Sequence, residues 1–260
     1  KMKEIGISKE DNFVCVHVRD SKHANDQGRR EFRNADINNY KETILYLLEK
    51  NYWVIRLGQS SNKKIEINHP KFIDYPFSQF KDHCLDLYLI KNCKFLICTP
   101  SGLHSLAVLF NKPILVTNVV RLFQTKSANE FSRTISKKPF WKKNKKLIIL
   151  KNYLKLKYVY HHMDYINNEI DFEENTSNEI LEAIKEFSGL LENKPDYKPK
   201  ANQISFRNFM LDSFKNHYQD TGSKNGSDFI DIPEAPNIVI NFKESKALYC
   251  STFLKKYFKF

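Results

Sequence analysis

Short apolar segments alternate with segments of helical spacing along the first 120 residues. Phe13 to Val18 is short, rich in β-branched residues and apolar on both faces, which predicts a fully buried strand. Tyr52 to Leu57, Lys94 to Cys98 and Pro113 to Val116 have the same character, and we expect a shorter strand at Phe72 to Tyr75. Strands buried on both faces are typical of a parallel sheet.

Helices are predicted between these strands. Asp36 stands where an N-cap is needed, before apolar residues spaced three and four apart. Two more helices are expected at Ser78 to Asn92 and Gly102 to Phe110, and Thr176 to Glu179 forms a capping box before a further apolar face. The alternation predicts right-handed βαβ units. The expected fold is therefore α/β, a Rossmann-like parallel sheet with helices on both faces.

The composition changes after this pattern ends. Pro, Lys, Asn, Ser and Gly dominate from Lys194 to Pro236, and aromatic residues return from Leu248 to Phe260. Such a composition favours a linker. We expect a main domain over residues 1–194, and a linker with a C-terminal extension over residues 195–260.

The formal net charge is +12, but only 8 of the 42 basic residues are Arg. A Lys, Asn, Ile and Phe excess follows from an AT-rich genome, and we find no zinc-finger spacing or arginine-rich arm, so nucleic acid is not an expected partner. Phe131 to Lys157 holds ten basic residues and no acidic one, whereas Asp164 to Glu192 is acidic. Two interpretations of the basic stretch stay open: a solvated lysine face, or a surface that meets anionic lipid or an anionic substrate.

The five cysteines are an odd set without a CxxC pair, and three lie in apolar stretches. We expect reduced thiols. No apolar run approaches the ~18 residues that a transmembrane helix needs, and we see no signal peptide. The sequence favours a cytoplasmic protein that is at most peripheral at the inner membrane face.

Ligands of parallel sheets bind beyond the carboxyl ends of the strands. There the first strand ends in His17-Val18-Arg19-Asp20. Arg19 offers a planar fork of donors that suits a phosphate, and Asp20, then His17, are candidates for a general base. The alternative is that Arg19 and Asp20 form a surface ion pair and that His17 is a core histidine.

Thr99-Pro100-Ser101-Gly102 joins a strand to a helix. With Thr99 as N-cap and Pro100 as the first helical residue, free amides would face an anion, and Gly102 would allow close approach to the backbone. The alternative is a plain helix cap. Arg56 and Gly58, at the end of the second strand, form a weaker candidate.

We expect no metal and no cofactor. An Asp-x-Asp pair is absent, and the neighbours His161 and His162, followed by Asp164, would point to opposite faces of a strand.

Several of these segments together resemble a family of bacterial glycosyltransferases from surface-polysaccharide gene neighbourhoods. They are FVCVHVRD, Phe32-Arg33-Asn34-Ala35-Asp36, YWVIRLG and DLYLIKNCKFLICTPSGLHSLAVLFNKPILVTN. More distantly they are similar to the GT-B fucosyltransferases. The match covers roughly residues 12 to 120, and more loosely the segment from Glu173 to Phe187. Where the fucosyltransferases have a second Arg after the first, this chain has Asp20, so neither fucose nor GDP follows.

The resemblance implies the C-terminal, donor-binding half of a GT-B-like fold. Arg19 would contact the donor diphosphate and stabilise the leaving nucleotide, while Thr99, Ser101 and Gly102 would bind phosphate or ribose. The implied donor site is completed by Arg33, Asn34, Arg56 and Gly58. The implied partners are a nucleotide-sugar and a glycan or lipid-linked acceptor. The resemblance also implies a separate acceptor domain, which we do not find in this sequence.

Two other functions are compatible with the same residues. One is a non-catalytic nucleotide- or glycan-binding module on a Rossmann-like frame. The other is a polysaccharide-modifying transferase of pyruvyl or phosphoryl groups that uses another donor. The observation that separates transferase from module is whether Arg19, Arg33, Ser101 and Gly102 line one open cleft.

Overall fold

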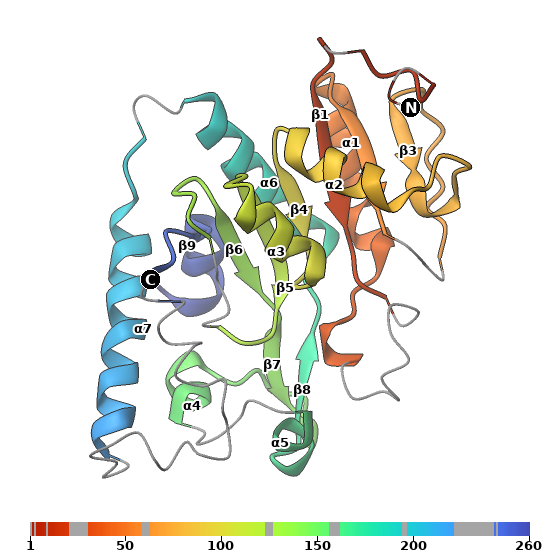
Figure 1. Ribbon diagram of the computed structural model, residues 1–260. Coiled ribbons are helices and arrows are strands. Elements are labelled where there is room, and N and C mark those ends of the chain that lie inside the picture. Colours follow the sequence, from red (N-terminus) through yellow and green to blue (C-terminus); the bar gives the residue numbers. More distant parts are fainter. Residues whose placement is uncertain are drawn as a thin grey trace.

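The computed structural model describes residues 2, 4–8, 10–20, 31–58, 63–122, 127–155, 162–193, 197–220, 242 and 244–260. Its centre is a seven-stranded sheet with the order β3-β2-β1-β4-β5-β6-β9, and all its strands run parallel (Figure 1). The strands are β1 Phe13–His17, β2 Trp53–Leu57, β3 Phe72–Asp74, β4 Leu96–Cys98, β5 Ile114–Val119, β6 Arg133–Ser136 and β9 Leu248–Tyr249. The order of the first six is that of a doubly wound Rossmann sheet, which confirms the predicted fold class.

Helices cover both faces of this sheet (Figure 1). Helices α1, α6 and α7 pack on one face, and α2 and α3 on the other. The helices are α1 Lys41–Glu49, α2 His83–Asn92, α3 Gly102–Leu109, α4 Leu150–Lys155, α5 His162–Asn167, α6 Ser177–Glu192, α7 Ala201–Asp220 and α9 Ser251–Phe253.

The two-sided burial of β1 explains this arrangement. Val14 and Val16 belong to the core under α1 and α6, whereas Phe13 and Cys15 belong to the core under α2 and α3. Successive side chains of a strand point to opposite faces, so a strand with no polar position needs a layer of helices on each side. The central strand is thus held firmly, and the residues that follow it are held with it.

Two predicted helix starts are confirmed and one is wrong. Asp36 caps the turn Ile37–Tyr40 that leads into α1, and Thr176 forms the capping box of α6 with Glu179. Helix α3, however, has Ser101 and not Thr99 as its N-cap. The Thr99 hydroxyl instead accepts a hydrogen bond of 2.9 Å from the backbone amide of Arg19, so it ties α3 to the end of β1.

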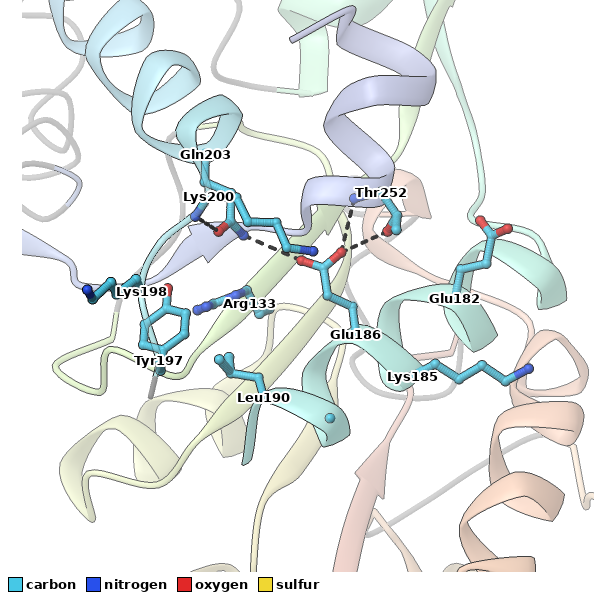
Figure 2. A pocket seen from close by; sticks show the side chains of 11 residues that line it. Arg133, Glu182, Lys185, Glu186, Leu190, Tyr197, Lys198, Lys200, Gln203 and Thr252 are labelled. Carbon is cyan, nitrogen blue, oxygen red and sulfur yellow. Dashed lines mark hydrogen bonds between the residues drawn. The ribbon is translucent and has the colours of Figure 1, made fainter. Parts of the chain in front are cut away.

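The stretch predicted as linker and C-terminal extension contributes to the main core. Residues 201–220 form helix α7, and Phe206 of α7 is buried in the same core as β1. Strand β9 extends the sheet beyond β6. Glu186 of α6 accepts hydrogen bonds from the amides of Ser251 (2.7 Å) and Thr252 (3.0 Å), which fixes the start of α9 (Figure 2). The segment 221–227, expected to be linker-like, lies outside the described residues.

The predicted basic stretch is not one continuous surface. Arg133, Lys137 and Lys138 are buried, with exposed fractions of 1%, 4% and 6%. Lys138 Nζ lies 2.8 Å from carboxylate oxygens of both Glu173 and Glu179. For these three residues the interpretation as a solvated lysine face is wrong, because they are buried and part of the acidic stretch folds back and pairs with two of them.

The pairing carboxylates arrive on an antiparallel ribbon, β7 Lys138–Trp141 with β8 Ile170–Glu173. Since β7 begins two residues after β6 ends, the ribbon lies beyond the carboxyl ends of the main sheet (Figure 1). Its outer end, residues 142–149, is called here the lysine tip. Lys142, Lys143, Lys145 and Lys146 are exposed there.

Two further findings concern cysteines and membrane spans. All five cysteines are free, and four are buried. None of the helices within the described ranges is both long and apolar enough to cross a bilayer.

The Lys138 pair allows a matched test of buried and exposed partners. Glu179 is 2% exposed in this pair and Glu173 is 51% exposed, at the same distance from Lys138 Nζ. We expect Glu179→Gln to lower the free energy of unfolding by about 3 kcal/mol or more, because it leaves a buried ammonium group short of its partner. Glu173→Gln should cost at most about 1 kcal/mol. Urea denaturation at pH 7 measures both, and equal values would contradict this account.

The same carboxylate predicts how stability depends on pH. Burial raises the pKa of Glu179, but hydrogen bonds from Lys138, Tyr257 and the Thr176 amide outweigh it, so the pKa lies below its usual value. Its contribution is therefore present at neutral pH and is lost as the pH falls through the folded-state pKa. The deficit of Glu179→Gln should shrink in acid.

Candidate functional site

The ends of β1 and β4 meet at the predicted position. Arg19 follows β1 and is 4% exposed, so its side chain is not a surface group. Its amide donates to Thr99, which follows β4, and the Thr99 amide donates to the carbonyl of His17 at 3.0 Å. These bonds continue the β1–β4 ladder past the strands, so Arg19 emerges from a fixed backbone.

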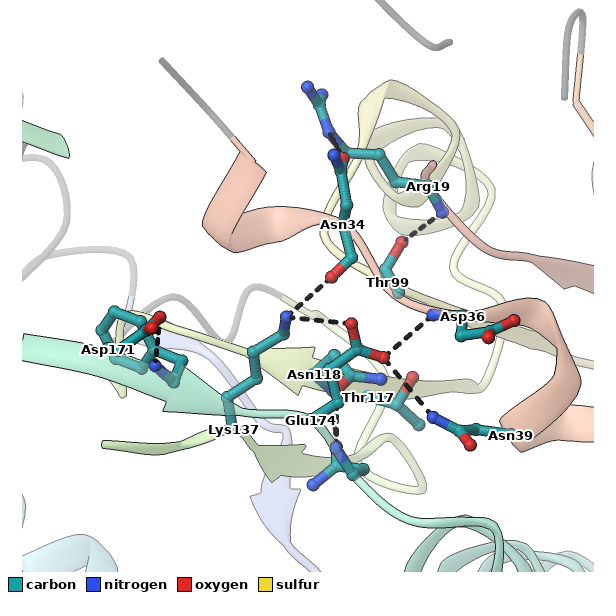
Figure 3. A network of polar contacts seen from close by, with 12 residues as sticks. Arg19, Asn34, Asp36, Asn39, Thr99, Thr117, Asn118, Lys137, Asp171 and Glu174 are labelled. Atoms are coloured by element: carbon teal, nitrogen blue, oxygen red, sulfur yellow. Dashed lines mark hydrogen bonds and ion pairs between the residues drawn. The ribbon is translucent and has the colours of Figure 1, made fainter. Parts of the chain in front are cut away.

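Asn34 fixes the guanidinium group of Arg19 (Figure 3). Arg19 Nε donates to Asn34 Oδ1 at 3.0 Å, and the Asn34 carbonyl accepts a bond of 2.6 Å from Lys137 Nζ. The amide of Ala35 returns to the Arg19 carbonyl at 2.9 Å. The predicted pair Arg19 and Asn34 is thus brought together, and Lys137 is added to it from the end of β6.

Glu174 neutralises this second cation. Its Oε1 lies 3.7 Å from Lys137 Nζ, and its Oε2 accepts from the amide of Asp36 (2.9 Å) and from Asn39 Nδ2 (3.4 Å). Burial lowers the pKa of Lys137, and the carboxylates of Glu174 and Asp171 act against this effect. Strands β6 and β8 are thereby linked to the loop that carries Asn34 (Figure 3).

Beside this network lies a pair of asparagines that sequence reasoning missed. The Asn118 amide donates to Asn175 Oδ1 at 2.7 Å, and the Asn175 amide donates to Asn118 Oδ1 at 2.8 Å. Asn118 has a φ of 55°, at an irregularity in the pairing of β5 with β6. Asn118 Nδ2 also donates to Tyr40 Oη at 3.0 Å, and Tyr40 bonds Thr117. Applying the strand-end rule to Thr117 and Asn118, after PILV, would have identified this corner.

The loop before α3 is tied to the same region by Arg33. Arg33 Nη2 donates to the Pro100 carbonyl at 2.8 Å. This bond brings the predicted residue Arg33 next to the residue that precedes the predicted Ser101. The Ser101 hydroxyl is buried without a hydrogen-bond partner among the described residues. A Cβ added at Gly102 would meet no other side chain within 4 Å, and Gly102 is exposed at the start of α3.

A cavity of about 290 Å³ opens at these strand ends. Asp20, Asn34 and Arg56 line it, together with Asp36 and Lys63. Arg19, Arg33, Ser101 and Gly102 are not among the described residues of its wall. The four residues, called here the Arg19 cluster, therefore do not line this cavity together, so the observation that would separate a transferase from a module is not met there. Asn34 connects Arg19 to the cavity, because it lines the cavity and binds Arg19.

Arg56 is first of all a structural cation. It is 1% exposed, and its Nη1 lies 3.1 Å from Asp74 Oδ1 and donates to the Lys63 carbonyl at 2.8 Å. Burial lowers the pKa of Arg56, and Asp74 acts against this. Gly58 has a φ of 149°, which favours glycine. A role of either residue toward a donor stays a prediction.

His17 is buried, and its Nδ1 lies 3.2 Å from the Leu57 carbonyl. This contact fits the core-histidine alternative, whereas Asp20 lines the cavity, and its role as a base stays a prediction. In the described part of the chain no three His, Cys, Asp or Glu side chains gather as metal ligands would. The candidate ligand His161 and the side chains of His162 and Asp164 lie outside it.

No protein-family model matches the chain, and no curated protein matches it. Solved structures do. The E. coli ADP-heptose LPS heptosyltransferase II matches at 16% identity and a TM-score of 0.44, over 74% of this chain and 50% of that one. The iron-containing dodecameric heptosyltransferase TibC in complex with ADP-D-β-D-heptose matches at 14% identity and a TM-score of 0.38. This match covers 71% of this chain and 47% of that one. A second structure of TibC, a bacterial iron-containing dodecameric glycosyltransferase from enterotoxigenic E. coli H10407, matches at 18% identity and a TM-score of 0.27. This match covers 42% of this chain and 28% of that one. The chain spans half or less of the length of each.

The Arg19 cluster should bind a diphosphate. Arg19→Lys keeps the charge but loses the planar fork, so we expect it to weaken pyrophosphate binding about tenfold or more in isothermal titration calorimetry. Asn34→Ala removes the acceptor that orients Arg19 and should weaken binding by a smaller factor.

The control is Arg207→Lys on α7, since Arg207 contacts Phe242 and lies outside this cluster. If Arg19→Lys and Arg207→Lys bind pyrophosphate equally well, the cluster is structural.

Proposed function

We propose that this chain is the nucleotide-sugar-binding part of a glycosyltransferase, which moves a sugar from a nucleoside-diphosphate donor onto a surface glycan or glycolipid. The observation that carries the proposal is the Arg19 cluster. A buried arginine, oriented by Asn34, emerges at the end of the central strand, beside the accessible start of α3. In doubly wound sheets this is where phosphates bind.

Each residue has a distinct part in the proposed reaction. Arg19 and the amides at the start of α3 would hold the diphosphate, whose negative charge grows as the sugar leaves, so these interactions strengthen in the transition state. Asp20, which lines the cavity, would accept the proton of the acceptor hydroxyl. Asn34 is a positioning residue, because it acts through Arg19.

A panel of nucleotide-sugars in a thermal-shift assay tests the donor, because a bound ligand stabilises the fold by mass action. We expect one donor to raise Tm and to be consumed when a lipid-linked or polysaccharide acceptor is present. Arg19→Ala should lose about 2 to 4 kcal/mol of transition-state stabilisation in kcat/KM. Binding of a donor without consumption would favour the non-catalytic module, and stabilisation by no member of the panel would refute the proposal.

The proposed chemistry uses a cation and a helix start where other transferases use a metal. We therefore expect the turnover to persist in excess chelator. Loss of turnover in chelator that Mn²⁺ or Mg²⁺ restores would contradict this part.

A lipid-linked acceptor would place the lysine tip at a membrane. Besides its four exposed lysines, the tip presents Leu147 at 50% and Ile149 at 64% exposure. Cationic and apolar side chains together suit an anionic bilayer, where each lysine is worth about 1 kcal/mol. The lysine tip and the Arg19 cluster both lie beyond the carboxyl ends of the main sheet strands (Figure 1). Both would therefore face one acceptor surface.

Vesicle sedimentation tests this contact. Replacing the four tip lysines (142, 143, 145 and 146) by Gln should reduce binding to vesicles with 30% phosphatidylglycerol by tenfold or more, since their attraction to the surface is lost. A matched set of exposed lysines elsewhere (41, 64, 91 and 94) serves as the control. Sedimentation that does not depend on anionic lipid would remove the membrane from the proposal.

A further inference from the structure

A second cavity, of about 550 Å³, lies beside the start of β6 (Figure 2). Arg133, in its wall, is the first residue of β6, whereas Lys137 of the donor-site network follows the last residue of that strand. One face of α6 forms a wall with Glu186 and Leu190, and the residues that lead into α7 form another. Arg133 and the Lys137 of that network thus lie at opposite ends of β6.

Arg133 is the unusual group in this cavity. It is 1% exposed, and its Nη1 donates to the carbonyls of Glu130 (2.9 Å) and Ser132 (2.8 Å). Nε makes no hydrogen bond to any residue within the described ranges. The guanidinium group also interacts with the side chain of Tyr197. None of the described carboxylates comes within the 4.0 Å of an ion pair with it.

A buried guanidinium group normally has an anionic partner, because burying an unpaired charge is costly. The side of the group that carries Nε and Nη2 is one of the edges with which arginine binds a carboxylate or phosphate through two parallel bonds. Tyr197 covers the flat face of the group, with its ring centre 5.0 Å from the guanidinium carbon. Arg133 is therefore held in place while its Nε has no hydrogen-bond partner among the described residues.

The surroundings of Arg133 favour an anion with an apolar part. Lys198 and Lys200 are exposed at the rim (Figure 2). The carboxylate of Glu186 is already engaged, because it binds the amides of Ser251 and Thr252 and the side chain of Thr252. Leu190 and the ring of Tyr197 add apolar wall.

We propose that this cavity binds a small organic anion, whose carboxylate or phosphate group bonds the Nε and Nη2 edge of Arg133 while an apolar or aromatic body lies against Leu190 and Tyr197. The site does not depend on the proposed transferase activity, since it shares no residue with the Arg19 cluster.

Isothermal titration calorimetry with benzoate and with phenyl phosphate distinguishes the two anionic groups, and benzyl alcohol is the neutral control. We expect saturable binding of at least one anion and none of benzyl alcohol. Arg133→Lys should weaken binding tenfold or more, since the ammonium group lacks the planar edge. Arg19→Ala should leave it unchanged, which separates this site from the donor site.

Because Arg133 is buried, a second variant tests the rim alone. The double variant Lys198→Glu and Lys200→Glu changes exposed side chains, and we expect it to weaken binding severalfold while the circular dichroism spectrum stays that of the parent. The proposal is overturned if neither anion binds saturably, or if Arg19→Ala abolishes binding. Inorganic phosphate that binds as tightly as phenyl phosphate would overturn the assigned apolar contact.

Discussion

Two buried lysines at the end of β6 govern how the C-terminal half of this protein is arranged. Lys137 and Lys138 directly follow the last residue of β6, and each is less than one tenth exposed. Buried lysines are normally paired with carboxylates, because an unpaired buried charge is costly. The ribbon β7–β8 and the start of α6 bring these carboxylates, Glu174 and Glu179, back to the same place.

This requirement connects the protein's packing to its candidate chemistry. Lys137 also bonds the carbonyl of Asn34, and the Asn34 side chain orients Arg19. The guanidinium group at the end of β1 is therefore positioned, through two intermediates, by the same neutralisation that holds the ribbon. A change in Glu174 would reach the guanidinium group of Arg19 without touching it.

The sequence predicts the sheet well because its signals are local. Apolar runs mark the first five strands, and Asp36 and Thr176 mark helix starts by their own hydrogen-bonding chemistry. It predicts long-range pairing poorly. Nothing adjacent to Lys138 indicates that Glu179 will neutralise it, so a basic stretch resembles a surface. Thr99 has a residue type that is common at helix N-caps. Its hydroxyl instead accepts a hydrogen bond from the amide of Arg19, eighty residues away in the sequence.

The same distinction applies to the candidate site. The strand-end rule finds Arg19 and Thr99 because topology alone brings the ends of β1 and β4 together. It does not find Lys137 or Asn175, whose positions depend on the ribbon and on the irregular end of β5. The composition of residues 201–220 favours a linker, but Phe206 and Met210 bury themselves in the core and make it a helix.

Strand β9 has a consequence for the newly made chain. It covers the outer edge of β6. Its first residue, Leu248, comes about 115 positions after its partner Arg133 in the sequence. At a translation rate of about 5 to 20 residues per second, the ribosome takes roughly 6 to 23 s to add them. During this interval the backbone amides and carbonyls of β6 are an open template for another nascent chain. The order of synthesis therefore gives this fold a period of exposure to aggregation that its finished structure conceals.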